Sequence, residues 1–131
     1  MNPDLLMIAD RDLAILRAFR PHEQLQRELE RAIVVSAEAL PADVVRMRSR
    51  VRYVDETTGE RRAVTIVYPP EADAAQGRIS VLAPVGAALL GLSTGQAIEW
   101  AFPDGSRRRL RVEAVLPPDA SAAESGVSDG G

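Results

Sequence analysis

The stretch that decides the fold is GRISVLAPVGAALLGL, residues 77–92. Its first half, from Arg78 to Leu82, predicts a strand, because a glycine-containing loop precedes it and Pro84 follows it. Its second half predicts one short helix, since proline is favoured at the first helical position and glycine near the end. This stretch therefore predicts a strand that leads almost directly into a helix.

Before this stretch, the hydrophobic period is two, as in a half-buried strand. From residue 44 to 53, apolar or small residues alternate with Arg46, Arg48, Arg50 and Arg52. Alternate side chains of a strand share a face, so we expect these four arginines on one face, extended by the last strand of the chain. A turn at 55–59 and a returning strand at 61–68 complete a hairpin, which Pro69 ends.

After this stretch, a second hairpin is predicted. Residues 98–102 and 107–116 read as strands, and PDGS at 103–106 is a typical tight turn. In the last strand, Leu110, Val112 and Ala114 are expected to point inward. Because the strands cluster together rather than alternate with helices, the predicted class is α+β.

The first 35 residues read as two short amphipathic helices. Leu13 and Leu16 recur at helical spacing, Pro21 breaks the pattern, and Leu25 and Leu29 form a second apolar stripe. We therefore expect a short helical hairpin over 1–35, a β domain over 36–116 and a tail of disordered composition over 117–131. The alternative is that the two helices simply cap the β domain.

Composition excludes several functional classes. The chain has 131 residues, no cysteine and one histidine, so disulfides, thiolate metal sites and histidine-based zinc sites are not expected. No phosphate-loop or nucleophile-elbow motif is present, so neither an enzymatic activity nor a cofactor is predicted. No apolar run is long enough to span a bilayer and no signal peptide is evident, which predicts a cytoplasmic protein.

Residues 71–92 resemble the C-terminal domain of the GreA/GreB family of transcription elongation factors. The shared frame is EAD at 71–73, GRIS at 77–80, Pro84 and ALLG at 88–91. The continuation GQAIEW at 95–100 is similar to the Rnk branch, the regulators of nucleoside diphosphate kinase. The similarity runs from about Val34 to Val115. It implies an FKBP-like antiparallel β domain with one short helix, preceded here by a truncated coiled coil.

The resemblance also implies a function and a site. In Gre factors, the β domain binds RNA polymerase near its secondary channel, and a long coiled coil carries acidic residues to the channel for RNA cleavage. The matching docking residues are Leu82, Ala83, Pro84 and Val85, although Gre factors usually have an acid and a serine in place of the first two. The short helices and the single acid at their turn, Glu23, predict a non-enzymatic regulator without cleavage activity. We also expect a monomer.

Two other functions fit parts of the sequence. An FKBP-like domain admits peptidyl-prolyl isomerase activity, which needs an aromatic-lined pocket, and Trp100 and Phe102 are among the few aromatic residues available. The face predicted for Arg46, Arg48 and the two following alternate arginines admits a nucleic-acid-binding module. Direct contact with nucleic acid is therefore possible but not required, and no interaction with a membrane is expected.

Overall fold

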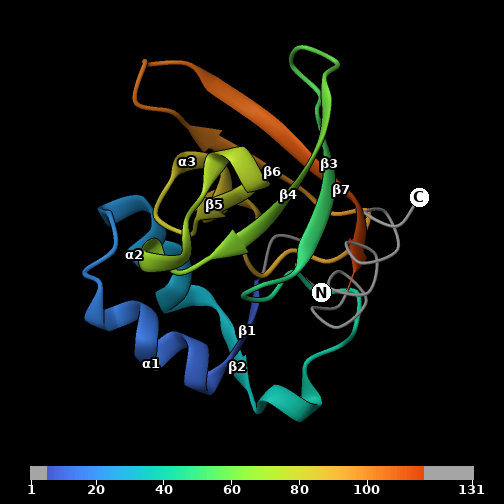
Figure 1. Ribbon diagram of the computed structural model, residues 1–131. Coiled ribbons are helices and arrows are strands. Elements are labelled where there is room, and N and C mark those ends of the chain that lie inside the picture. The colour runs from blue at the N-terminus through green and yellow to red at the C-terminus, as the bar shows by residue number, and fades with distance from the viewer. Residues whose placement is uncertain (1–5, 117–131) are drawn as a thin grey trace.

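The computed structural model describes residues 6–116, and the tail predicted to be disordered lies outside this range. It mixes helices and strands, which confirms the α+β class (Figure 1). In chain order the elements are β1 (Met7–Ala9), α1 (Asp10–Ala18), α2 (Glu23–Arg31), β2 (Ile33–Val35), β3 (Arg50–Asp55), β4 (Arg61–Val67), β5 (Arg78–Ser80), α3 (Pro84–Leu89), β6 (Ala97–Ala101) and β7 (Arg107–Leu116).

The main sheet has the strand order β5-β4-β3-β7-β6. Its neighbouring strands are antiparallel except at one edge, where β4 and β5 run parallel, with Thr65 opposite Arg78. The prediction of a purely antiparallel sheet is therefore wrong at this edge. Two single 3₁₀ turns, Pro69–Glu71 and Ala74–Gln76, carry the chain back so that β5 starts beside β4 in the same direction.

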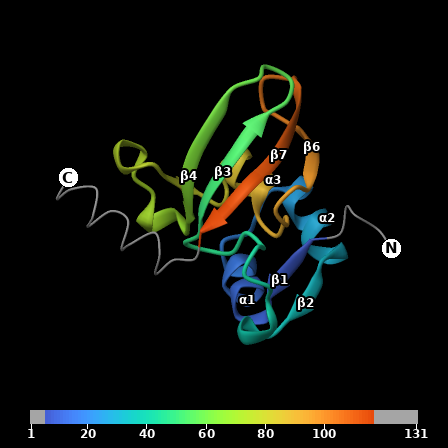
Figure 2. The same cartoon turned by 90° about the vertical axis from the view of Figure 1, so that its right-hand side faces the viewer.

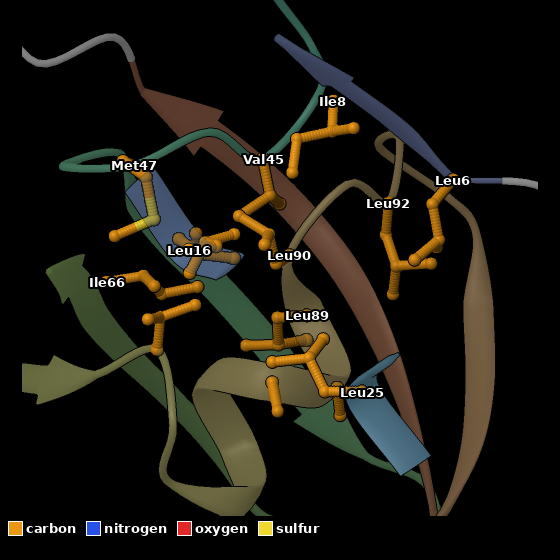
Figure 3. Close-up of a cluster of buried hydrophobic side chains, with 14 of the residues drawn as sticks. Leu6, Ile8, Leu16, Leu25, Val45, Met47, Ile66, Leu89, Leu90 and Leu92 are labelled. Carbon is orange, nitrogen blue, oxygen red and sulfur yellow. The ribbon is translucent and has the colours of Figure 1, made fainter. Parts of the chain in front are cut away.

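The helix α3 lies behind β3 and β7 in the view of Figure 2. Leu89 and Leu90 lie at its end, both almost fully buried among side chains from the sheet and from the N-terminal helices. Figure 3 shows Leu16, Leu25 and Ile66 converging on this region from α1, α2 and β4. Burial of these side chains from separate elements is the main favourable contribution to folding.

The two predicted N-terminal helices are present, but the expectation that residues 1–35 are helical throughout is wrong. Met7–Ala9 and Ile33–Val35 pair as a parallel two-stranded sheet. The helices contribute to the same core as the main sheet, which agrees with the capping alternative. On α1, the Tyr68 hydroxyl donates to Asp12 Oδ1 at 3.0 Å, and the rings of Phe19 and Tyr68 stack with centroids 5.9 Å apart.

The first strand of the main sheet begins later than predicted. Val44 forms only an isolated bridge, residues 46–49 form a turn in which the Ser49 N–H donates to the Arg46 carbonyl at 3.1 Å, and β3 starts at Arg50. Within the turn, the Arg46 N–H donates to Ser49 Oγ at 3.1 Å, and Arg48 has a left-handed backbone with φ of 68°. The predicted alignment of four arginines on one strand face is therefore wrong for Arg46 and Arg48.

A β-bulge changes the inward set of the last strand. The pairing of β3 with β7 shifts register between Arg52 and Tyr53, so that Arg52 lies opposite Ala114 and Tyr53 opposite Val112. Beyond the bulge, Val115 packs against the core. The expectation that Ala114 points inward is wrong, because one extra residue on a strand moves the following side chains to the other face.

We predict that Leu16→Ala destabilises the whole domain. Leu16 is 0% exposed and its removal leaves a cavity beneath the sheet, so the free energy of unfolding should fall by about 2–5 kcal/mol. Urea unfolding followed by the fluorescence of Trp100, the single tryptophan and a residue of β6, measures this loss in the β domain itself.

Ile15→Ala is the matched control, because Ile15 is the neighbouring residue of α1 and is 42% exposed. Its unfolding free energy should change by no more than about 0.5 kcal/mol. If the Leu16→Ala curve overlays the wild-type curve, α1 does not share the core of the sheet.

Candidate functional site

The predicted docking residues form a short segment, here called the loop: Leu82 and Ala83 connect β5 to α3, and Pro84 and Val85 are the first two residues of α3. The Leu82 N–H donates to Ser80 Oγ at 3.0 Å, and the Ala83 N–H donates to the Ser80 carbonyl at 3.0 Å. Pro84 then begins α3, where its missing N–H is not needed. All four loop residues are half-buried. The hydrogen bonds therefore hold a partly exposed apolar loop in one conformation.

Gly86 allows α3 to approach β5 closely. A Cβ atom at this position would overlap the carbonyl oxygen of Ser80, which is the same carbonyl that fixes the loop. A larger residue would push the helix away from the strand. The spacing between Pro84 and this glycine is therefore part of how the loop is positioned.

An apolar pocket of about 340 Å³ opens on one side of the loop. Leu82 and Pro84 form one wall, and Trp100 and Phe102 of the β6 region form another. The remaining lining residues come from the start of α2, from α3 and from the turn after β6: His22, Gln24, Leu25, Ala87, Ala101 and Pro103. An apolar pocket with a few polar groups at its rim is typical of a binding site.

Gln24 closes the open edge of the sheet beside this pocket. Its Nε2 donates to the Ala101 carbonyl at 3.1 Å, and its Oε1 accepts the Ala101 N–H at 3.2 Å. The side-chain amide thereby takes the place of a neighbouring strand on β6, which is an edge strand. This contact fixes the start of α2 against the pocket.

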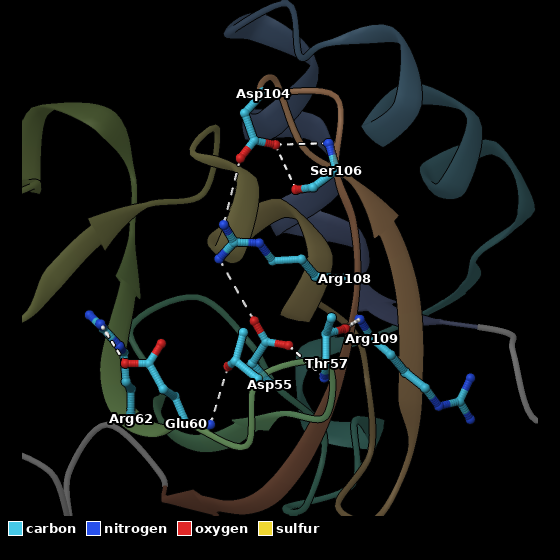
Figure 4. Close-up of polar contacts among 9 residues, drawn as sticks. Asp55, Thr57, Glu60, Arg62, Asp104, Ser106, Arg108 and Arg109 are labelled. Atoms are coloured by element: carbon cyan, nitrogen blue, oxygen red, sulfur yellow. Dashed lines mark hydrogen bonds and ion pairs between the residues drawn. The ribbon is translucent and has the colours of Figure 1, made fainter.

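A second, more polar pocket of about 180 Å³ lies on the Val85 side, and Phe102 lines both pockets. Figure 4 shows its charged residues. Asp55, which is 6% exposed, lies 3.7 Å from Arg108 and accepts the Thr57 N–H at 2.9 Å. Arg108 also lies 3.7 Å from Asp104.

The guanidinium of Arg108 stacks over the Phe102 ring, 4.8 Å from its centroid. Two carboxylates and one aromatic ring therefore hold this cation in place. The hydrogen bond from the Ser106 hydroxyl lowers the pKa of Asp104, and burial raises the pKa of Tyr53 in the pocket wall. At neutral pH the pocket wall therefore presents a neutral phenol, and an ionised Asp104 stands beside Arg108.

The two arginines that leave the predicted strand face have structural partners. Arg46 Nη2 donates to the Leu40 carbonyl at 2.9 Å. Arg48 forms two hydrogen bonds to Glu71, and the bond from Arg48 lowers the pKa of the Glu71 carboxyl. Arg48 also lies over the Tyr68 ring at 6.0 Å. Only Arg50 and Arg52 of the predicted set remain on the strand, half-buried and exposed respectively.

The single histidine has a local role in the structure. His22 is exposed and caps α2, with its Nδ1 accepting the Gln24 N–H at 3.3 Å. Within residues 6–116 no cluster of three or more His, Asp or Glu residues is arranged to hold a metal ion. The same part of the chain contains no helix long and apolar enough to cross a membrane.

The apolar pocket is also lined by residues outside the predicted docking set, 82–85. Trp100 and Phe102 were identifiable as aromatic residues on one strand face. Gln24 carried no local signal, because its partner Ala101 lies 77 residues away in the chain. The site therefore joins the predicted loop to an edge strand and to the start of α2.

Comparison with known sequences confirms the predicted resemblance. The family model described as transcription elongation factor, GreA/GreB, C-term matches residues 40–117. Over 100 residues the chain is 44% identical to the protein named regulator of nucleoside diphosphate kinase from Escherichia coli K12, covering 76% of this chain and 74% of that one. It is 40% identical over 90 residues to transcription elongation factor GreA of Azorhizobium caulinodans, covering 69% and 57% respectively.

Solved structures agree with this result. The chain superposes on a prokaryotic transcription elongation factor GreA/GreB from Nitrosomonas europaea with a TM-score of 0.67 and 39% identity, covering 86% of this chain and 98% of that one. Gfh1 from Thermus aquaticus gives a TM-score of 0.50 and 33% identity, over 71% and 59% of the two chains.

We predict that Gln24→Leu exposes the edge of β6. The variant keeps the size of the side chain but loses both hydrogen bonds to Ala101, each worth about 1 kcal/mol. Amide hydrogen exchange measured by NMR should show protection of the Ala101 N–H falling by about tenfold or more.

Gln26→Leu is the matched control, since Gln26 lies on the same helix with its side chain exposed. Exchange at Ala101 should match the wild type in this variant. Equal protection of Ala101 in both variants and the wild type would contradict the role assigned to Gln24.

Proposed function

Because the chain belongs to the GreA/GreB family, we propose that it is a non-enzymatic transcription regulator that binds RNA polymerase through residues 82–85. The observation that carries this proposal is the fixed, half-buried apolar loop at the start of α3. The loop lies between an apolar pocket and a charged pocket that share Phe102. A partner surface thus meets apolar and charged groups within one small area.

The rigidity of the loop supports a docking role. A loop already held in one conformation loses little entropy on binding. Leu82 and Val85 are partly exposed while packing against the core, so a partner side chain can bury their remaining apolar area without rearranging the domain. The polar pocket adds Arg108 and Asp55, which can pair with charged groups at the rim of the interface.

We further propose binding near the secondary channel of the polymerase, without stimulation of RNA cleavage. A helix of nine residues such as α1 extends only about 14 Å. Leu16 and Leu25 anchor α1 and α2 in the core of the domain, so neither helix projects as a long arm. The turn between them offers the single acid Glu23, whereas two carboxylates are needed to share a catalytic cation.

The isomerase alternative rests on the apolar pocket beside Trp100. Trp100 is 4% exposed, so most of its surface packs in the core and little is left for a bound proline. This burial favours the docking proposal. A proline-peptide isomerisation assay with the purified protein discriminates the two functions directly.

We predict that Pro84→Asn weakens binding to core RNA polymerase at least tenfold. The substitution replaces apolar contact area at the centre of the loop with a polar amide, a change of about 1.4 kcal/mol or more in binding free energy. Pull-down of core polymerase over a range of concentrations of the regulator measures the shift.

Ala39→Asn is the matched control, because it introduces the same residue at an exposed position of a short 3₁₀ turn outside the loop and its pockets. Its binding should equal that of the wild type. No binding by the wild type at micromolar concentrations, or equal loss in both variants, would refute polymerase docking through this loop.

We predict no acceleration of RNA cleavage when the protein is added to backtracked polymerase complexes, because the short helices present only Glu23 at their turn. Gel analysis of the labelled transcript measures the cleavage rate with and without saturating protein. A rate increase that Glu23→Gln abolishes would overturn this prediction.

A further inference from the structure

The outward face of the main sheet is not covered by α3, which lies on the other side (Figure 2). The register of the paired strands shows which side chains lie on this face. Arg50 and Arg52 of β3 lie opposite Thr65 and Ala63 of β4, and Arg52 also lies opposite Ala114 of β7. Residues directly opposite each other share a face, so Arg52 stands between two alanines, whereas Arg50 stands between Thr65 and Leu116 of β7.

The face carries an excess of positive charge. Its arginines outnumber its glutamates by six to three, an excess of three positive charges among the described residues. We call this surface the arginine face: Arg50, Arg52, Arg61, Arg107, Arg109 and Arg111, with Glu56, Glu99 and Glu113.

The three glutamates form ion pairs with four of the six arginines of this face. Glu56 accepts hydrogen bonds from Arg109 at 2.9 Å and from Arg111 at 2.7 Å, and these bonds lower the pKa of its carboxyl. Two other pairs, Arg61 with Glu113 at 2.9 Å and Arg107 with Glu99 at 3.3 Å, complete the pairing.

Arg50 and Arg52 make no ion pair or side-chain hydrogen bond within the described residues. They lie two residues apart on a strand, so their Cα atoms are about 7 Å apart and their side chains point the same way. No acid within residues 6–116 pairs with either side chain, and Arg52 is exposed while Arg50 is half-buried. They are therefore available to an external anion.

We propose that the arginine face binds the phosphate backbone of duplex nucleic acid, independently of base sequence, with Arg50 and Arg52 as its principal contacts. Guanidinium groups pair with phosphate oxygens in planar, two-point geometry, and a row of them on a rigid sheet suits a regularly spaced polyanion. This proposal does not depend on polymerase binding, because residues 82–85 lead into α3 on the opposite side of the sheet.

The chemistry of the face favours a duplex over two other partners. A protein interface needs buried aromatic or aliphatic anchors, and the neighbours of Arg52 are Ala63 and Ala114. A single-stranded nucleic acid needs aromatic rings on which bases stack. Phe102 and Trp100 instead line the apolar pocket. Positive charge along a sheet face, with alanines on both sides of Arg52, fits a backbone that carries phosphates at short intervals.

The test is fluorescence anisotropy of a labelled DNA duplex of mixed sequence, titrated with the full chain at low and at physiological salt. The double variant Arg50→Gln/Arg52→Gln should bind about tenfold more weakly at low salt. The slope of log affinity against log salt concentration should fall by about 1–2, since each lost phosphate contact removes close to one released counterion.

Arg11→Gln/Arg17→Gln is the matched control, because it removes the same charge from two exposed arginines of α1 and leaves the arginine face intact. Its affinity should stay within about twofold of the wild type at physiological salt, where charges more than about 8 Å from the phosphates contribute little. Equal loss of affinity in both double variants would reduce the effect to net charge and overturn the proposal.

Three other outcomes would also overturn it. No duplex binding by the wild type, together with loss of polymerase binding in Arg50→Gln/Arg52→Gln, would assign the face to an acidic protein surface. Duplex binding that appears only in Asp119→Asn/Glu124→Gln/Asp129→Asn would assign the face to the acidic end of the chain itself. Binding that requires a single-stranded probe would assign it to unpaired nucleic acid.

Discussion

Burial of the apolar residues at the end of α3 determines how the rest of the described chain is arranged. Leu89 and Leu90 are almost fully buried, and side chains from both N-terminal helices and from the sheet pack in the same core cluster (Figure 3). A helix of six residues has little stability of its own, so α3 depends on these contacts. The same contacts hold α1 and α2 against the sheet and fix where the loop at 82–85 leaves β5.

This shared core distinguishes the chain from a protein that carries its helices as an independent arm. An amphipathic helix that buries Leu16 or Leu25 in the domain cannot extend away from it without exposing that surface to water, at a cost of about 1.5–3 kcal/mol for each leucine. The hydrogen bond from Tyr68 to Asp12 adds a polar tie to α1. The helices therefore act as walls of the pocket beside Trp100, and function has to be sought on the surface that they help to build.

The sequence predicted correctly those bounds that turn residues or a proline mark directly. The last strand, 107–116, has the predicted bounds, and Pro84 begins α3 as expected, because turn residues and a proline mark these positions. The predicted start of β3 was wrong because Val45, just before the turn, and Met47, within it, are both buried and keep the alternation of a strand. The strands β1 and β2 are too short, at three residues each, to produce a periodic signal. Gln24 joined the site through tertiary contact alone.

The arginine face and the acidic net charge of the chain are compatible because electrostatic attraction is local. The whole sequence has a formal net charge of −3, yet charges separated by more than about 8–10 Å are largely screened at physiological ionic strength. A phosphate backbone that approaches Arg50 and Arg52 therefore senses these two cations of β3, which make no ion pair within residues 6–116, rather than the more distant acids. Glu56 and Glu113 pair with Arg111 and Arg61, leaving the central part of the face positive. The order of residues along β3 and its neighbours, and not the overall composition, thus determines which partner this surface can attract.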